Sequence, residues 1–282
     1  MINTNCNFTI NGIPVNLDVK TKKLVTGKDE ILYLKHGGGI DTNWDYEGYT
    51  VTNFLEKKHY NDFIDVITKL VKEKLELVKN KKIDNFILDQ YHTYVNDEEH
   101  YKFLKFVTSG TKGINGIPLS ILPFESKLLD KLVSDLCGRP YTTRKTFYKI
   151  FTNNHFWLRI VRPQKTDNNP PHRDCYFKKN TKIVNIYAPI AGSNWYSSLP
   201  ILPGSHYINE KDVTNTSGKT FINGVRFSNP GIMHCSKGLN LITPNPQPGQ
   251  LMVFTPYTIH GGGCNRNKDT TRISLEMRFW WN

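Results

Sequence analysis

The stretch Phe254-Thr255-Pro256-Tyr257-Thr258-Ile259-His260-Gly261-Gly262-Gly263 places one histidine between an apolar segment and a run of glycines. The residues that lead into it, Gln250-Leu251-Met252-Val253-Phe254, form the short apolar run expected of a buried β-strand. The glycines favour a flexible turn directly after His260. The stretch therefore predicts a strand that ends near His260 and leaves its imidazole beside a turn.

A second pair of ligand-type residues lies upstream, in Pro170-Pro171-His172-Arg173-Asp174. In an extended strand, side chains two residues apart point to the same face, so His172 and Asp174 can aim at one point. Alone, this pair is more typical of a polar surface loop than of a metal site. With His260 it supplies two imidazoles and a carboxylate, which suits a non-haem iron(II) ion with open positions. Catalytic zinc sites also use three protein ligands, so these residues leave the metal undecided.

A possible carboxylate receptor, Arg272-Ile273-Ser274, follows His260 by about a dozen residues. Two-residue spacing again puts the guanidinium and the hydroxyl on one face of a strand. A guanidinium can hold a carboxylate through two parallel hydrogen bonds, and the hydroxyl adds a third donor. The pattern predicts a site for one end of a dicarboxylate near the metal. The alternative is that Arg272 pairs with an internal acid such as Glu276.

The chain after about residue 145 has the composition of β-structure. Short segments rich in branched and aromatic residues are separated by Pro, Gly and Asn, which favours an antiparallel sandwich or barrel. The segments are Phe156–Val161, Ile183–Ile190, Gln250–Phe254 and Ile273–Trp280.

The first half instead predicts helices. Residues 59–78 carry apolar side chains at a period near 3.6, namely Phe63, Ile67, Leu70, Val71, Leu75 and Val78. A second helix is expected from Asn96, with Glu99 closing a capping box, to Gly110. A third has one apolar face and ends at Gly138, its apolar residues being Leu128, Leu129, Leu132, Val133 and Leu136.

These patterns predict an α+β protein. A small hairpin is expected around Phe8–Ile13, because Asn11-Gly12 suits a tight turn. The hairpin and helices of residues 1–145 would support a β-core formed by residues 146–282, with both parts in one structural unit.

Composition is typical of a soluble globular protein, with 38 % hydrophobic and 22 % charged residues among 282. No apolar run reaches the roughly 18 residues of a membrane-spanning helix, and the N-terminus lacks the pattern of a secretion signal. The cysteines are odd in number, scattered and without metal-binding spacing. We therefore expect a cytoplasmic protein without membrane insertion.

A net charge of +12 should attract anions. Much of the excess lies in residues 57–82, where intervening acids indicate a solvated helix face rather than a groove for nucleic acid. An anionic small-molecule substrate fits the charge, and nucleic-acid modification is the less favoured alternative. The sequence does not indicate an oligomeric state.

Together, the motifs resemble the Fe(II)/2-oxoglutarate-dependent dioxygenases, in particular the phytanoyl-CoA-dioxygenase (PhyH)-like family. Four pieces occur in the order of that family. They are Gly48-Tyr49-Thr50-Val51-Thr52-Asn53-Phe54-Leu55, His172-Arg173-Asp174, Leu199-Pro200-Ile201-Leu202-Pro203-Gly204-Ser205-His206, and His260 with Arg272-Ile273-Ser274. Their joint order is specific, although each motif alone is not. The resemblance runs from about residue 48 to the C-terminus.

The resemblance implies a double-stranded β-helix core, a cupin-like jelly roll, with the metal at its open end. It implies that His172, Asp174 and His260 bind Fe(II) and that Arg272 and Ser274 bind the C5 carboxylate of 2-oxoglutarate. Tyr187 and Asn185 would lie beside this co-substrate. O₂ would be the oxidant, and succinate and CO₂ would be released. Because related halogenating enzymes lack the carboxylate ligand, Asp174 favours hydroxylation or a desaturation-type outcome.

Candidate contacts for a small polar or anionic substrate are Arg159, Arg162, Arg173, Trp195 and Arg226. A rival hypothesis from another class is a non-catalytic jelly-roll protein that binds a metal or ligand without turnover. Arg272 with Ser274 separates the two, because a simple binding domain has no need of a dicarboxylate receptor.

Overall fold

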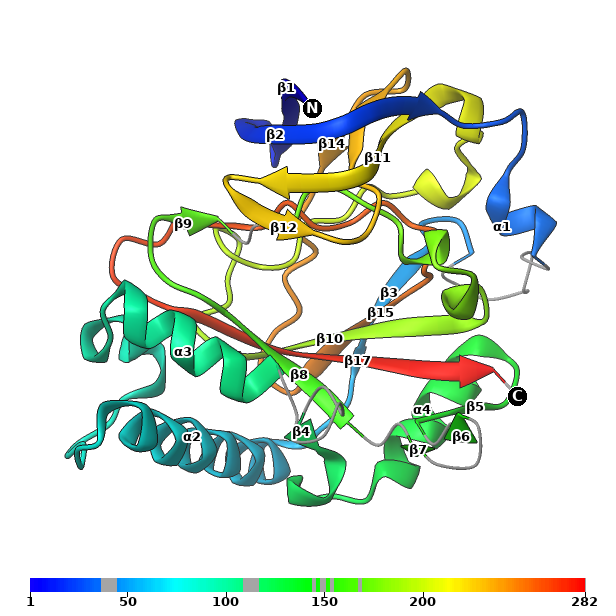
Figure 1. The fold of residues 1–282 in the computed structure, drawn as a ribbon. Helices are drawn as coiled ribbons and strands as arrows, with labels where there is room; N and C mark the ends of the chain where they lie inside the picture. The colour runs from blue at the N-terminus through cyan, green and yellow to red at the C-terminus, as the bar shows by residue number, and fades with distance from the viewer. Residues whose placement is uncertain are drawn as a thin grey trace.

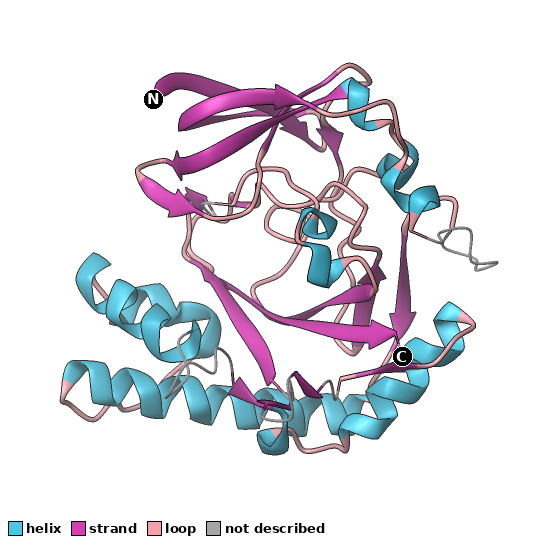
Figure 2. Cartoon of the chain, turned by 45° about the vertical axis from the view of Figure 1, so that its right-hand side comes forward, coloured by secondary structure: helices cyan, strands magenta, loops and turns pink. Residues whose placement is uncertain are grey.

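The protein folds into two facing β-sheets with helices packed on the outside of one of them (Figures 1 and 2). This computed structural model describes residues 1–36, 45–108, 117–143, 146–147, 151–152, 155–166 and 169–281. No helix in these ranges is long and apolar enough to cross a membrane.

The larger sheet lies next to the helices and is antiparallel throughout. Its strand order is β3 (Tyr49–Asn53), β15 (Gln250–Phe254), β10 (Ile183–Ala191), β17 (Arg272–Trp281), β8 (His155–Val161) and β4 (Ile117–Pro118), and β5 (Tyr141–Thr142) pairs with β17. The β-segments predicted from the sequence are thus confirmed as strands of one sheet.

Alternation along β17 gives this sheet two different faces. Ile273, Leu275, Met277 and Phe279 point toward the helices and are buried in the main apolar core. The residues between them point toward the second sheet and are polar or charged: Arg272, Ser274, Glu276 and Arg278. One strand therefore serves the apolar core on one side and a polar interior on the other.

The three predicted helices are confirmed as α2 (Lys57–Lys79), α3 (Asp97–Thr108) and α4 (Ser126–Cys137). In the predicted capping box of α3, the Glu99 amide donates to Asn96 Oδ1 and the Asn96 amide donates to the Glu99 carboxylate, at 2.9 and 3.0 Å. Gly138 ends α4 with a left-handed backbone conformation. The predicted stop at Gly110 lies outside the described residues. The prediction was wrong for Leu128, which was placed on the apolar face of α4. This residue lies in the first turn of the helix and is 57 % exposed.

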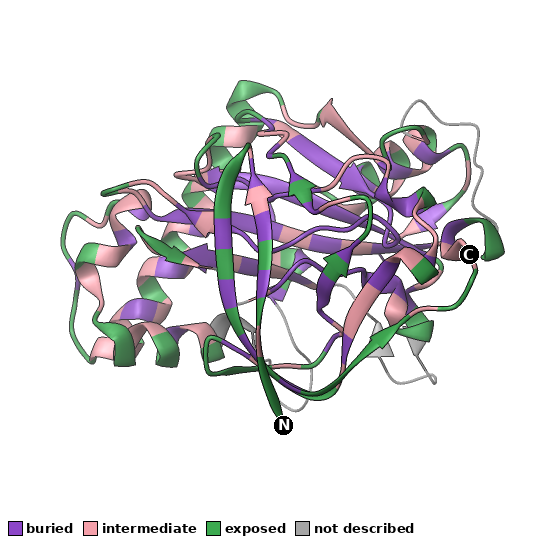
Figure 3. Ribbon diagram, turned by 90° about the horizontal axis from the view of Figure 1, so that it is seen from above, coloured by how far each residue is buried: buried purple, intermediate pink, exposed green. Residues whose placement is uncertain are grey.

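The smaller sheet includes the N-terminal hairpin. Its order is β12 (Val225–Phe227), β11 (Val213–Ile222), β2 (Ile13–Thr26), β1 (Ile2–Ile10) and β14 (Asn240–Leu241), and β13 (Ile232–Cys235) pairs with β11. Asn11 and Gly12 both have positive φ in the tight turn, which confirms the predicted hairpin. Along β2, buried and exposed residues alternate (Figure 3). The predicted division of the chain near residue 145 stays a prediction. Strands β1, β2 and β3, which precede residue 145, belong to the two sheets.

Single-residue bridges continue the smaller sheet through less regular segments. Gly231 pairs with His172, His172 with His260, His260 with Ile201, and Ile201 with Ile242 beside β14. Together, the larger and the smaller sheet form a double-stranded β-helix, or jelly roll, which the N-terminal helices support. The fold is α+β, as predicted.

The remaining elements are short and lie mostly between strands of the two sheets. They are α1 (Leu32–Lys35), β6 (Thr146–Phe147), β7 (Phe151–Thr152), β9 (Lys165–Thr166), β16 (Cys264–Asn265) and the 3-10 helices η1 (Leu88–Tyr94), η3 (Leu119–Ile121), η4 (Asp174–Tyr176), η5 (Lys178–Asn180), η6 (Ser205–Tyr207) and η7 (Glu210–Asp212).

The packing of α2 against the larger sheet gives a matched test within one helix. Leu75 is fully buried, whereas Leu77 is 65 % exposed. Leu75→Ala should lower the free energy of unfolding by about 2–5 kcal/mol, because it leaves a cavity in the core. Leu77→Ala should change it by less than about 0.5 kcal/mol. Equal losses for the two variants in urea unfolding would contradict the packing described.

Candidate metal centre

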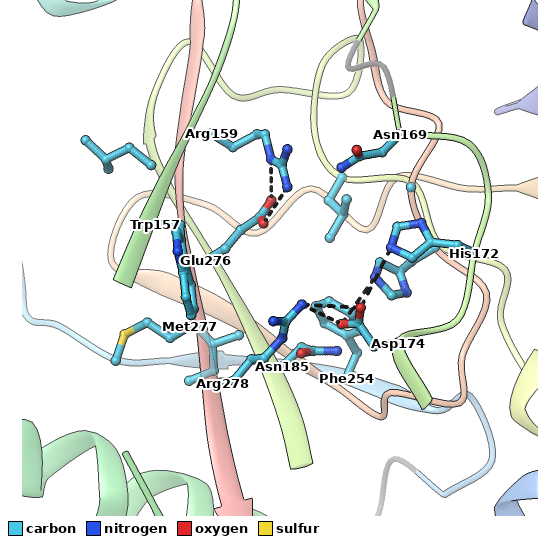
Figure 4. Close-up of a pocket in the computed structure, with 15 residues that line it drawn as sticks. Trp157, Arg159, Asn169, His172, Asp174, Asn185, Phe254, Glu276, Met277 and Arg278 are labelled. Carbon is cyan, nitrogen blue, oxygen red and sulfur yellow. Dashed lines mark hydrogen bonds and ion pairs between the residues drawn. The ribbon is translucent and has the colours of Figure 1, made fainter. Parts of the chain in front are cut away.

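Three side chains meet between the two sheets (Figure 4). One ligand-type atom from each of His172, Asp174 and His260 lies within 4.8 Å of the other two. The His172 Nε2 atom is 3.8 Å from Asp174 Oδ1, and the His260 Nε2 atom is 3.9 Å from Asp174 Oδ2. All three side chains are buried. The structure thus brings together the three residues singled out in the sequence.

Backbone pairing fixes the two histidines relative to each other. The His172 amide donates to the His260 carbonyl at 2.9 Å, and the His260 amide donates to the His172 carbonyl at 3.0 Å. The two imidazoles therefore stand side by side, with ring centroids 4.5 Å apart. Because the pair belongs to the β-ladder, the position of both rings follows from the fold.

Hydrogen bonds on the far side of each ring determine which nitrogen can bind a metal. His172 Nδ1 lies 2.8 Å from the Pro170 carbonyl, and His260 Nδ1 lies 2.9 Å from the Thr258 carbonyl. A carbonyl oxygen only accepts, so both Nδ1 atoms carry the proton in these bonds. In a neutral imidazole this leaves the lone pair on Nε2, which faces Asp174 in both cases.

The glycine after His260 is required by close approach as well as by backbone conformation. Gly261 has φ +99°, and a Cβ built there would lie 2.9 Å from His172 Nδ1 and 2.8 Å from the Pro170 carbonyl oxygen. Any side chain would therefore displace a ring of the triad or the group that orients it. This explains why a glycine follows His260 directly.

The charges of the triad suit a cation. Burial alone would raise the pKa of Asp174, but the neighbouring Arg278 guanidinium lowers it well below its usual range. Burial, with a contribution from His260, lowers the pKa of His172 to about 4. Near neutral pH the triad offers an ionised carboxylate and a neutral His172. The residues present fit a divalent metal ion.

A cavity of about 220 Å³ adjoins the triad. Its lining includes the aromatic side chains of Trp157 and Phe254 and the apolar Leu199. It also includes polar and charged residues besides the triad, namely Arg159, Asn169, Asn185, Glu276 and Arg278.

Two arginines on adjacent strands form ion pairs in this cavity. Arg159 on β8 binds the Glu276 carboxylate at 3.1 and 3.3 Å. Arg278 Nη2 lies 3.3 Å from each oxygen of Asp174. Glu276, the acid considered as an internal partner for Arg272, forms an ion pair with Arg159.

The residues expected to bind the co-substrate lie on the inner face of the larger sheet. Arg272 and Ser274 are almost fully buried, and the Arg272 guanidinium lies 6.0 Å from the centre of the Tyr187 ring. The Tyr187 hydroxyl contacts Ser193 Oγ at 2.7 Å. Asn185 borders the cavity, whereas the other three do not. Their role in co-substrate binding stays a prediction.

Of the predicted substrate contacts, only Arg159 lines the cavity. Arg173 points away because it lies between two residues that face the metal site, and it forms a buried ion pair with Glu210. Arg162 binds Asp97 at 2.6 Å at the start of α3. Trp195 and Arg226 are exposed outside the cavity.

Sequence reasoning missed Arg278, which lies beside Asp174. The signal was the two-residue alternation of β17, which places every second residue after Arg272 on the same face. The sequence could not show that Asp174 reaches this strand, because the contact joins residues 104 positions apart.

No family model matches the chain, and no curated protein matches it. Solved structures to which the chain is similar include "EctD from S. alaskensis with 2-oxoglutarate and 5-hydroxyectoine", at 11% identity and TM-score 0.49, covering 93% of this chain and 85% of that one. Another is AviO1 from Streptomyces viridochromogenes Tue57, at 12% identity and TM-score 0.48, covering 90% and 96%. A third is "the non-heme alpha ketoglutarate dependent epimerase SnoN from nogalamycin biosynthesis", at 10% and TM-score 0.44, covering 84% and 78%.

Loss of a triad side chain should weaken metal binding. His172→Ala and Asp174→Ala should each lower the affinity for Mn²⁺ by roughly 100-fold or more, which exceeds the 10–100-fold typical of outer-shell partners. His234→Ala, at an exposed position on β13, is the matched control and should bind as the parent does. Calorimetric titration measures all three. If the triad variants retain parental affinity, the metal assignment is wrong.

A glycine variant tests the close approach at the triad. Gly261→Ala should lower Mn²⁺ affinity by roughly tenfold or more, although Gly261 offers no ligand, because the new Cβ must displace His172 or Pro170. Gly224→Ala is the control, since Gly224 also has positive φ but nothing lies within 4 Å of its added Cβ. Equal effects of the two substitutions on affinity would indicate that backbone strain alone is responsible.

Proposed function

We propose that the protein is an iron(II)- and 2-oxoglutarate-dependent oxygenase that oxidises a small molecule and releases succinate and CO₂. One observation carries the proposal. Two imidazoles held with Nε2 facing Asp174, together with that ionised carboxylate, converge at the wall of a partly enclosed cavity. Two histidines and one carboxylate leave positions on an octahedral ion open for co-substrate and O₂.

The polar inner face of β17 supports the choice of co-substrate. Arg272 and Ser274 lie on the same face as Glu276 and Arg278, which border the cavity. A buried guanidinium with a neighbouring hydroxyl is suited to the C5 carboxylate of 2-oxoglutarate. Tyr187, packed beside Arg272, and Asn185, at the cavity wall, would complete this site.

In the proposed reaction, iron supplies the site where O₂ is activated while 2-oxoglutarate is oxidatively decarboxylated. The protein orients both reactants and limits the access of water. Trp157, Leu199 and Phe254 give the cavity apolar walls, and the backbone pairing of His172 with His260 holds the ligands in place. Because Asp174 occupies the carboxylate position, we propose hydroxylation as the outcome.

The proposed substrate is a small polar or anionic molecule rather than nucleic acid, and the proposed setting is the cytoplasm. The cavity of about 220 Å³ suits a small ligand. The net charge of +12 would favour the approach of an anion.

Binding of the co-substrate tests the proposal before any substrate is known. In the presence of Mn²⁺, 2-oxoglutarate should bind the parent protein, and Arg272→Met should lower its affinity by about tenfold or more, because a charge-assisted pair of hydrogen bonds is lost. Lys58→Met is the control, since Lys58 is exposed on α2 and lies outside the cavity. Calorimetry measures the affinities, and succinate release with iron and O₂ gives a second readout.

A parent protein that binds Mn²⁺ but not 2-oxoglutarate would contradict the proposal. That result would favour a non-catalytic jelly-roll protein that binds a metal.

A further inference from the structure

Two nitrogen-bearing side chains lie next to each other at the wall of the cavity. Arg278 on β17 is the direct register partner of Asn185 on β10. Both residues line the cavity, and Figure 4 shows the Asn185 amide beside the Arg278 guanidinium and near Asp174. The pair therefore presents N–H donors close to the triad.

The Asn185 amide points to a missing acceptor. The residue is 4 % exposed, and its Nδ2 atom has no hydrogen-bond partner among the residues that the structure describes. Leaving a buried donor unsatisfied costs about 1–3 kcal/mol, so native proteins rarely keep one without a reason. A ligand that supplies an oxygen at this wall would remove the cost.

Arg278 retains donors that its ion pair does not use. In the described part of the chain, its hydrogen bonds all come from Nη2 and go to Asp174. Its guanidinium carbon lies 5.6 Å from the centre of the Trp157 ring, a contact that helps to fix its orientation. The remaining N–H groups suit an oxyanion held side-on. Arg159 is less suited, because Glu276 already takes its charge.

Charge balance favours a single negative charge on that ligand. Arg159 and Glu276 neutralise each other. Among the described residues that line the cavity, Arg278 is ion-paired with Asp174, whose carboxylate would also bind the metal ion. A carboxylate on the ligand would then supply the negative charge that Arg278 shares with the metal, and an uncompensated charge in a partly buried site is unfavourable.

We propose that the primary substrate carries a carboxylate that binds Arg278 and Asn185 beside the metal. This inference rests on the proposed function and adds the class of substrate. The carboxylate contacts Arg278 on the side that Asp174 leaves free, so that Arg278 links the substrate to the metal-binding acid. The substrate is thereby held by its charged end, and its remaining part extends along the cavity.

A pair of small probes tests this site without knowledge of the full substrate. Protein loaded with Mn²⁺ and saturated with 2-oxoglutarate is mixed with propionate or with propionamide, which has the same shape but no charge. Mn²⁺ accelerates the nuclear relaxation of protons on a molecule bound nearby. Proton relaxation therefore reports both the affinity of each probe and its proximity to the metal.

Propionate should bind at least tenfold more tightly than propionamide. Arg278→Met should remove most of this preference, since hydrogen bonds to a charged group contribute about 1.5–3 kcal/mol. Arg278→Lys should restore part of it by returning the charge. Asn185→Asp should weaken propionate binding by adding a negative charge at the wall. Lys58→Met, at an exposed position of α2 outside the cavity, should leave the binding of both probes unchanged.

The inference is overturned if the two probes bind alike or if Arg278→Met and Arg278→Lys both bind propionate as the parent does. It is also overturned if saturation with 2-oxoglutarate displaces propionate, because the carboxylate site then belongs to the co-substrate. Failure of the proposed function would look different. In that case the parent would bind no Mn²⁺ or no 2-oxoglutarate before any probe is added, and the inference would fall with it.

Discussion

The site depends on one pair of reciprocal backbone hydrogen bonds, between His172 and His260. These bonds join two segments 88 positions apart into one ladder and place both imidazoles on the same side of it. The Pro170 and Thr258 carbonyls then fix each ring so that Nε2 faces Asp174. Gly261 allows the two segments to approach this closely. The two imidazoles are thus set by backbone geometry, with little left to side-chain freedom, and the Arg278 side chain holds the Asp174 carboxylate.

The larger sheet provides the second half of the site. Its outer face is apolar and holds the helices, so its inner face is free to carry charged groups without loss of the main core. Glu276 and Arg278 lie on this inner face, as does Arg159 on the neighbouring strand, and all three line the cavity. Each of these charges has an opposite charge within the cavity, which is the condition under which buried ions are tolerated.

Local patterns predicted much of this structure. The capping box of Asn96 and Glu99 and the Asn11-Gly12 turn depend on neighbouring residues and were confirmed. The convergence of His172, Asp174 and His260 was expected from ligand chemistry and resemblance.

Sequence alone could not give the pairing of β2 with β11 or the choice of Arg159 as the partner of Glu276, because register and partner choice are set by distant contacts. Arg173, a predicted substrate contact, pairs with Glu210 outside the cavity, and strand alternation would have indicated that it points away from Asp174.

The central claim is that three side chains hold one metal ion between the sheets. Anomalous diffraction from crystals of the protein grown with Mn²⁺ tests it most directly. The account predicts one strong anomalous peak about 2.0–2.3 Å from His172 Nε2, an Asp174 oxygen and His260 Nε2. A fully occupied Mn²⁺ site elsewhere in the protein would contradict it, if no metal lies at the triad and Asp174 is still paired with Arg278.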